Sequence, residues 1–300
     1  MATVPLQQPG TSEIDLPNLE KSLRHPRTAF SAALSIIALA LSIIAILPLG
    51  SVLVMLIYRG SQYVSIHLFT QLPPAAMMPG GGIGNALLGT LVMVGVASFL
   101  SVPVGILGGV YLAEFGPETR TATAVRFSAK VLTGLPSILA GVFAYALVVT
   151  AMGKFSALAG GVALSILMLP IVMLTAEQAI RMVPHRMREA AIGMGCTPSQ
   201  AVWKVILPAA RPGLLTGVML AVARAAGETA PLLFTAMFSD YWIHRLAEPT
   251  ASLAVLIYDF SGQPYPNLIG FAWSASLVLV LIVLSLNIIA QVYLRRTQDK

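Results

Sequence analysis

Charged residues are scarce in this sequence of 300 residues: 10% are Asp, Glu, Lys or Arg, whereas 57% are hydrophobic. So few charges cannot cover the surface of a soluble globule of this length, and the mean hydropathy of +0.83 agrees with that. Composition therefore predicts a protein that crosses a membrane several times. The net charge of +6 comes from short basic clusters without interleaved aromatic side chains, so it does not indicate a nucleic-acid surface.

Catalytic and metal-binding patterns are missing as well. The lone cysteine, Cys196, excludes an internal disulfide, and the four histidines form neither an HExxH motif nor a His-rich tract. No GxxxxGK[ST] phosphate loop and no motif that frames a nucleophile occur. The sequence thus predicts no metal site, no cofactor bound by this chain and no enzymatic activity of its own.

Long apolar runs dominate what is present. A bilayer core of ~30 Å needs about 20 apolar residues as a helix. We predict an all-α membrane protein whose transmembrane domain covers residues 29–295, between a flexible tail of 1–28 and a short tail of 296–300. Its six spans are predicted at about 30–58, 84–112, 128–152, 157–176, 213–238 and 269–293.

The basic residues orient these spans, because Lys and Arg gather on the cytoplasmic side of a membrane. They are frequent in the tail, after the second span, after the fourth span and at the end of the chain. The opposite gaps hold only Arg59, Lys154 and Arg245. Both termini are therefore predicted to be cytoplasmic.

The longest cytoplasmic gap, 177–212, is more than a connector. Thr197 before Pro198 is a strong helix start, and Gly195 is suited to end the helix before it. We predict two short helices that meet at a sharp bend, small enough to enter a cleft of a partner. The competing interpretation is an amphipathic helix at the membrane interface.

Arg224 and Glu228 form a charged pair inside the fifth span. Arg224 lies about 11 residues from Gly213, or ~16 Å along a helix, near the middle of the bilayer. A charged side chain at that depth is costly to insert, so it usually marks a substrate path. The planar guanidinium of arginine is suited to bind an oxyanion through two hydrogen bonds. Pro231 and Gly227 permit a local break in the helix. The alternative is a buried ion pair that only fixes helix packing.

The cytoplasmic gap resembles the EAA loop of ATP-binding-cassette (ABC) importer permeases. The matching residues are Glu189, Ala190 and Ala191, then Gly195, and then Val205 to Pro208, which includes Leu207. Val205 replaces the usual Ile and keeps a β-branched side chain. This resemblance implies a type I importer permease whose loop forms a coupling helix that docks on an ATPase. Because this chain lacks a phosphate loop, that ATPase would be a separate chain.

A second resemblance is narrower. The segment Arg224-Ala-Ala-Gly227-Glu228-Thr229-Ala230-Pro231 closely resembles the fifth span of PstA-type permeases of phosphate-specific ABC importers, as do Gly81 to Ala86 and Gly134 to Ile138. It implies a phosphate path along Arg224, Gly227, Glu228, Thr229 and Pro231 in the plasma (inner) membrane of a prokaryote. It also implies three partners and no nucleic acid: a PstC-like permease, a PstB-like ATPase dimer that holds ATP and Mg²⁺, and an extracytoplasmic PstS-like phosphate-binding protein.

Other functions stay open on the residues alone. Arg224 does not choose among oxyanions, so a molybdate or sulfate importer is an alternative, as is a stand-alone secondary transporter or channel. A membrane enzyme is the weakest candidate, because the sequence contains no catalytic motif. The outer segment 240–267 is predicted to carry a short helix that either contacts the binding protein or lies at the membrane interface.

Overall fold

The computed structural model describes residues 26–298, and within them every regular element is a helix. This confirms the predicted all-α class. The chain divides into two compact units, Met1–Val54 and Met55–Lys300. The first unit contains most of α1 (Pro26–Gly60), whose 35 residues would extend ~52 Å at 1.5 Å per residue, enough to cross a bilayer. Of the predicted tail, residues 1–25 lie outside the described part, and α1 already includes 26–28.

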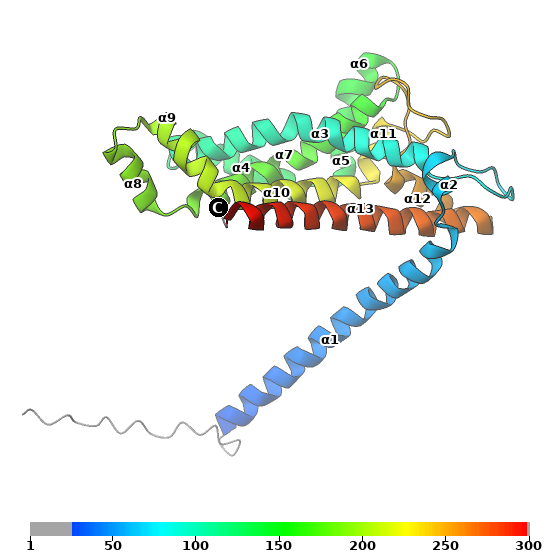
Figure 1. Ribbon diagram of the computed structural model, residues 1–300, viewed down its shortest axis with the longest axis horizontal. Helices are drawn as coiled ribbons and strands as arrows, with labels where there is room; N and C mark the ends of the chain where they lie inside the picture. Colours follow the sequence, from blue (N-terminus) through cyan, green and yellow to red (C-terminus); the bar gives the residue numbers. More distant parts are fainter. Residues whose placement is uncertain (1–25, 299–300) are drawn as a thin grey trace, which may run out of the picture. The chain divides into compact units, whose positions relative to one another are not determined.

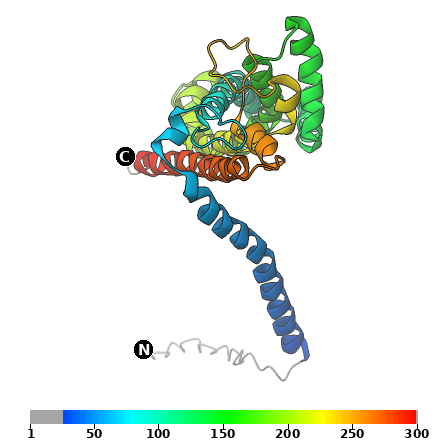
Figure 2. The same cartoon turned by 90° about the vertical axis from the view of Figure 1, so that its right-hand side faces the viewer.

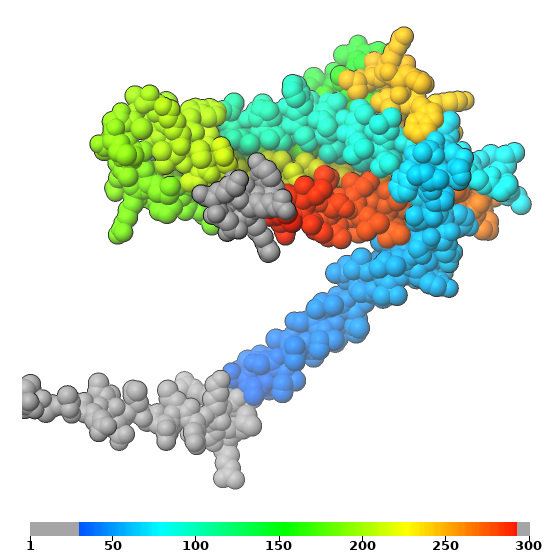
Figure 3. Space-filling model, in the orientation of Figure 1, coloured from blue at the N-terminus to red at the C-terminus, as the bar shows by residue number. Residues whose placement is uncertain are grey.

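The second unit is a bundle of long helices with short helices at both ends (Figure 1). Its long helices are α3 (Gly84–Val110), α7 (Ala157–Arg181), α10 (Leu207–Ala226) and α13 (Pro266–Gln298). One end carries α8 (His185–Gly193) and α9 (Pro198–Ala201), which we call the inner end after the charge-based orientation. The other, outer end carries α2 (Ile66–Thr70) and α12 (Leu253–Ser261). Figure 3 shows α8 and α9 in yellow-green at the tip of the inner end.

The contact between α3 and α7 depends on glycine. A Cβ atom on Gly109 would lie 2.6 Å from Ala176 Cβ, and one on Gly105 would lie 2.7 Å from Val172 Cγ1. Helix α7 contributes a glycine to the contact as well, because a Cβ on Gly161 would lie 2.5 Å from Val96 Cγ1 of α3. In a membrane, where lipid is as apolar as a side chain, such small residues let two helices approach closely and gain dispersion energy.

The third predicted span, 128–152, is wrong as a single helix. The chain forms α4 (Arg120–Gly134) and then α5 (Ser137–Ala144), which continues through a π-turn, η3 (Tyr145–Val149), into α6 (Thr150–Met152). The two parts meet at 104°. Pro136 disfavours the helical conformation at the residue before it, and Leu135 is extended at ψ 143°. Figure 2 shows the resulting upright helix, in green, running across the direction of the bundle.

The inner gap 177–212 also differs from its prediction. The first short helix exists as α8, but the second is the start of a continuous helical run of 29 residues, Pro198–Ala226. Thr197 caps it, and Gln200 completes a capping box. Pro208 and Pro212, which lack an N–H, lie within this run, directly after a π-turn, η4 (Val202–Ile206), that widens the helix. The gap also begins later than predicted, because α7 extends to Arg181.

The outer segment 240–267 contains the predicted short helix in an unexpected place. Leu253, Leu256 and Phe260 of α12 are buried, in one cluster with Leu68 and Phe271. Leu253 also donates its backbone N–H to Thr90 Oγ1 of α3 at 2.8 Å. Therefore α12 is a core element packed between α3 and α13 and not a helix lying at the membrane interface, while contact of the segment 240–267 with a binding protein stays a prediction.

Replacement of Gly109 by Leu should destabilise the bundle, because the new side chain overlaps α7. We expect the free energy of unfolding to fall by about 1–3 kcal/mol, the usual cost of overpacking. Gly95→Leu is the matched control: Gly95 is on the same helix, and a Cβ there would have no neighbour within 4 Å. Thermal unfolding of both purified variants in detergent checks this, and an equal loss in the control would contradict it.

Replacement of Gly195 by Ala should strain the bend between α8 and α9. Gly195 has a φ of +87°, which L-residues avoid, although a Cβ there would meet nothing within 4 Å. The expected loss of unfolding free energy is therefore about 1–2 kcal/mol and purely conformational. Gly193→Ala, two residues away at an ordinary φ and with equal space, should cause no loss in the same denaturation experiment. A harmless Gly195→Ala would disprove the strain.

Candidate functional site

Arg224 lies on the last turn of α10, where the fifth predicted span breaks. The helix ends at Ala226, and Gly227 and Glu228 donate their N–H groups to carbonyls three residues earlier, Arg224 and Ala225. A separate short helix, α11 (Ala230–Thr235), follows with Pro231 in its first turn. A proline is tolerated in a first turn because its missing N–H would have no helical partner there. The break that Gly227 and Pro231 permit is thus present.

The charged pair is formed but loose. Arg224 Nε donates to Glu228 Oε1 at 3.4 Å, which confirms their proximity. Among residues 30–292, whose side chains the structure describes, this is the one hydrogen bond of the Arg224 side chain, so both terminal nitrogens remain available as a fork. The Arg224 side chain is 45% exposed and that of Glu228 16%. An arginine that served only helix packing would have more of its donors satisfied inside the bundle.

Small residues hold the other face of α10 against α7. A Cβ on Gly213 would lie 2.6 Å from Ala179 Cβ, and one on Gly217 would lie 2.3 Å from Thr175 Oγ1. Ala221 and Ala225 continue this buried face. Because this packing fixes the rotation of α10, Arg224 is held on the surface of the chain.

The segment after the break is positioned by α5. Gly141 of α5 lies so close to α11 that a Cβ on it would be 2.6 Å from Pro231 Cα. Thr229 precedes α11 and its side chain caps no N–H, which leaves its hydroxyl available beside Glu228. The hollow that Val142, Tyr145, Phe155, Leu233 and Phe234 form nearby contains no charged side chain. This hollow therefore offers an anion no charged partner, whereas Arg224 does.

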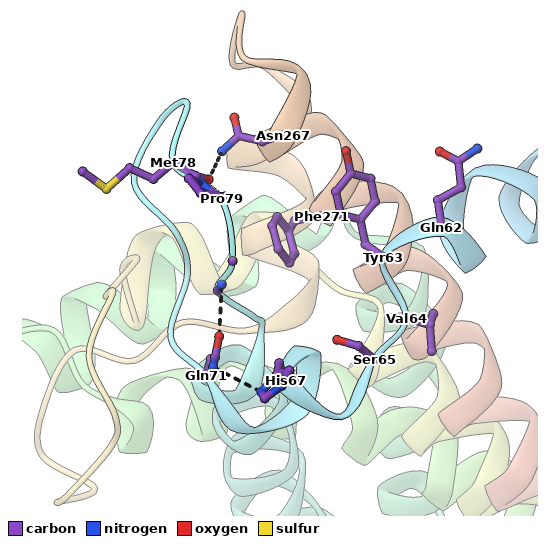
Figure 4. Close-up of a pocket in the computed structure, with 12 residues that line it drawn as sticks. Gln62, Tyr63, Val64, Ser65, His67, Gln71, Met78, Pro79, Asn267 and Phe271 are labelled. Carbon is purple, nitrogen blue, oxygen red and sulfur yellow. Dashed lines mark hydrogen bonds between the residues drawn. The ribbon is translucent and has the colours of Figure 1, made fainter.

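One hollow at the outer end differs from the surroundings of Arg224. It lies between α2, the loop before α3 and the start of α13 (Figure 4). Its polar groups are mostly bonded to one another: Gln71 to His67 and to the N–H of Gly81, and Asn267 to the backbone of 75–78. No lysine or arginine lines it. Elsewhere at the outer end, burial and the negative charge of the nearby Asp240 raise the pKa of the Asp259 carboxyl in α12.

The predicted coupling residues divide into two sets. Glu189 and Ala190 are exposed on α8, with Glu189 bonded to His185 Nδ1 at 3.1 Å, and Gly195 forms the bend. Ala191, by contrast, is buried, and Leu207 and Pro208 are partly buried in the run of 29 residues that leads to Arg224. The first set is accessible to a partner, whereas the second is packed within the chain.

The sequence analysis missed two ionic clusters at the inner end. In one, Arg188 of α8 bonds to Glu114; in the other, Glu177 of α7 accepts from both Arg126 and Arg181, at 2.7 and 2.9 Å. Glu177 is 6% exposed. The available signal was that Glu114 and Glu177 immediately follow long apolar runs, close to several arginines. Among the described residues, no group of three or more His, Cys, Asp or Glu side chains could hold a metal ion.

Comparison with known proteins identifies the family. Residues 105–299 match the family described as "binding-protein-dependent transport system inner membrane component". The chain is 41% identical to the "phosphate transport system permease protein PstA" of Haemophilus influenzae over 251 residues, 84% of this chain and 89% of that protein. The "probable phosphate transport system permease protein PstA" of Methanocaldococcus jannaschii is 35% identical over 82% of this chain and 87% of its own length.

Solved structures support the same fold. A chain of a bacterial alginate ABC transporter has a TM-score of 0.64, at 14% identity, covering 92% of this chain and 98% of that one. A chain of the MetNI methionine ABC transporter, in an inward-facing conformation, has a TM-score of 0.55 at 22% identity, covering 72% and 94%. The chain therefore belongs to the inner-membrane permease family of binding-protein-dependent transport systems, among its PstA-type members.

Proposed function

We propose that this chain is one permease subunit of an ATP-driven importer of inorganic phosphate. The observation that carries the proposal is the Arg224 guanidinium, largely without partners, at the end of the helical run that begins at the bend after α8. The names of its PstA-type relatives support phosphate as the substrate. The exposure of Arg224 supports a path that this chain forms only in part, with a second permease facing it.

Arg224 would bind the anion transiently. A guanidinium offers two parallel N–H groups to an oxyanion, which a lysine cannot match. Glu228 competes for the same guanidinium from 3.4 Å away and so keeps the binding modest. Its carboxylate also accepts a hydrogen bond from protonated phosphate, whereas sulfate is fully ionised and has no proton to donate. The pair thus favours phosphate over sulfate and molybdate, the competing substrates.

The partners follow from the same arrangement. We infer a PstC-like permease as the other half of the path, a PstB-like ATPase dimer that holds ATP and Mg²⁺, and a PstS-like protein that delivers phosphate from outside. The chain has no phosphate loop of its own, which supports a separate ATPase. The exposed residues Glu189 and Ala190 on α8 are suited to contact it.

Movement would pass from the ATPase to the site through helix geometry. When the ATPase closes, it displaces α8, and the bend at Gly195 passes this displacement to the run Pro198–Ala226. This run of 29 residues spans ~43 Å at 1.5 Å per residue and ends at the break beside Arg224. A displacement at the inner end therefore changes the angle at Gly227, which opens or closes the path next to the guanidinium. A stand-alone secondary transporter has no need for such a lever.

Arg224→Gln should reduce ATP-dependent phosphate uptake by roughly tenfold to a hundredfold, because a hydrogen bond to a charged group contributes about 1.5–3 kcal/mol. Uptake of labelled phosphate into proteoliposomes that contain the four-component complex measures this. Arg211→Gln is the control, since Arg211 is exposed at the inner end of the same helix. Wild-type uptake by both Arg224→Gln and Arg224→Ala would refute the site, and uptake driven by an ion gradient without ATP would refute the importer.

Glu228→Gln should weaken the preference for phosphate over sulfate, because a neutral amide still accepts a hydrogen bond but no longer repels a fully ionised anion or holds Arg224. We expect the ratio of the two uptake rates to fall by roughly tenfold, about 1.4 kcal/mol. Competition between labelled phosphate and unlabelled sulfate or molybdate in the same proteoliposomes measures the ratio. An unchanged ratio would show that Glu228 plays no part in selecting the anion.

A further inference from the structure

We propose that Arg188 and Glu114 are positioning residues that carry the movement of α8 to α3 and α7, by a route separate from the helical run that leads to Arg224. The inference rests on the proposed function, because it concerns how ATP hydrolysis is coupled to uptake. Neither residue contacts the proposed substrate path. Both act through the helices that they hold.

The exposure of α8 shows how few of its side chains reach the bundle. Of its nine residues, seven are exposed, and only Arg188 and Ala191 are covered. Ala191 is small and packs inward beside the bend, where α8 contacts α9 and η4. Arg188 is thus the one long side chain of α8 that extends to the rest of the inner end.

The Arg188 guanidinium bonds to two other elements at once. Nε and Nη2 donate to Glu114 Oε1 at 2.9 and 2.6 Å, and Glu114 lies in η2 (Tyr111–Phe115), the π-helical continuation of α3. Nη2 also donates to the carbonyl oxygen of Ile180, in the last turn of α7, at 2.8 Å, and Nη1 donates to that of Val183, just beyond the helix, at 2.6 Å. A cation is favoured at carbonyls that terminate a helix.

This arrangement resists displacement. The two side chains are 17% and 13% exposed, so a movement of α8 that broke the bonds would leave two charges poorly hydrated. The less costly response is that the inner ends of α3 and α7 follow α8. The planar guanidinium of Arg188, with four hydrogen bonds, passes on the direction of a displacement of α8 as well as its size. The ammonium group of a lysine is a point charge and would not fix the direction.

The second ionic cluster extends the route. Arg126 of α4 donates to Glu177 of α7 and to the carbonyl of Leu112 in η2, so α4 is tied to the same ends of α3 and α7. Beyond its bend at Pro136, α4 leads into α5, which touches Pro231 through Gly141. One route from α8 therefore reaches the break at Gly227 from the α10 side, and the other reaches it from the α11 side.

The test compares ATP hydrolysis with phosphate uptake in the reconstituted complex that contains Glu114→Gln or Arg188→Lys. Gln keeps an acceptor oxygen and Lys keeps the charge, so both changes are mild. We expect hydrolysis stimulated by the loaded binding protein to persist, while phosphate imported per ATP falls by roughly threefold or more, within the range of mutations along coupled networks. Arg120→Gln is the control, because Arg120 is exposed at the same inner end.

Each outcome of this experiment either supports or overturns the proposal. An unchanged ratio of phosphate to ATP in both variants overturns the proposal. A parallel loss of hydrolysis, uptake and complex assembly in both variants also overturns it, because Arg188 and Glu114 would then only hold the fold together. Failure of the proposed function has a different signature: the unmodified complex would hydrolyse ATP without importing phosphate, and no variant would be needed to see it.

Discussion

The close approach of α3 and α7 is the constraint on which the second unit depends. Lipid supplies no hydrophobic force to bring two apolar helices together, so their association requires many short contacts. Gly105 and Gly109 on α3 and Gly161 on α7 allow those contacts. Helix α10 packs against α7 through Gly213 and Gly217. Both ionic clusters attach to the inner ends of α3 and α7. A helix pair that could not approach would position neither Arg224 nor Arg188.

Stiff and soft segments alternate along the path from α8 to Arg224. The run Pro198–Ala226 is the stiffer segment because it stays helical over 29 residues, although Pro208 and Pro212 each remove one backbone hydrogen bond from it. Its ends are soft for different reasons: Gly195 needs a positive φ, and Gly227 precedes a segment whose helix starts anew at Ala230. The proposed lever needs this alternation, because a uniformly soft helix would absorb the displacement. Fully rigid ends would not let the proposed path open.

The charged residues show how far sequence reasoning reaches. Arg224 and Glu228 were found because two charges in an apolar span are conspicuous and a spacing of four brings them together on a helix. Arg188 and Glu114 were missed because they lie 74 positions apart and both occur where charges are expected, at the ends of spans. Likewise, the bend of 104° at Pro136 was missed, because it depends on what α5 packs against after the break.

Composition and periodicity determined the helical class, most of the long helices and the segments that hold the candidate sites, because hydropathy and the spacing of charges are local properties. They also indicated the bend at Gly195 and the weak point between Gly227 and Pro231. Tertiary structure alone decided that α12 is a core element, that the second short helix of the inner gap is continuous with the span of Arg224, and which arginine meets which glutamate. Those outcomes depend on contacts between residues far apart in the chain, and such contacts form only once the helices have packed.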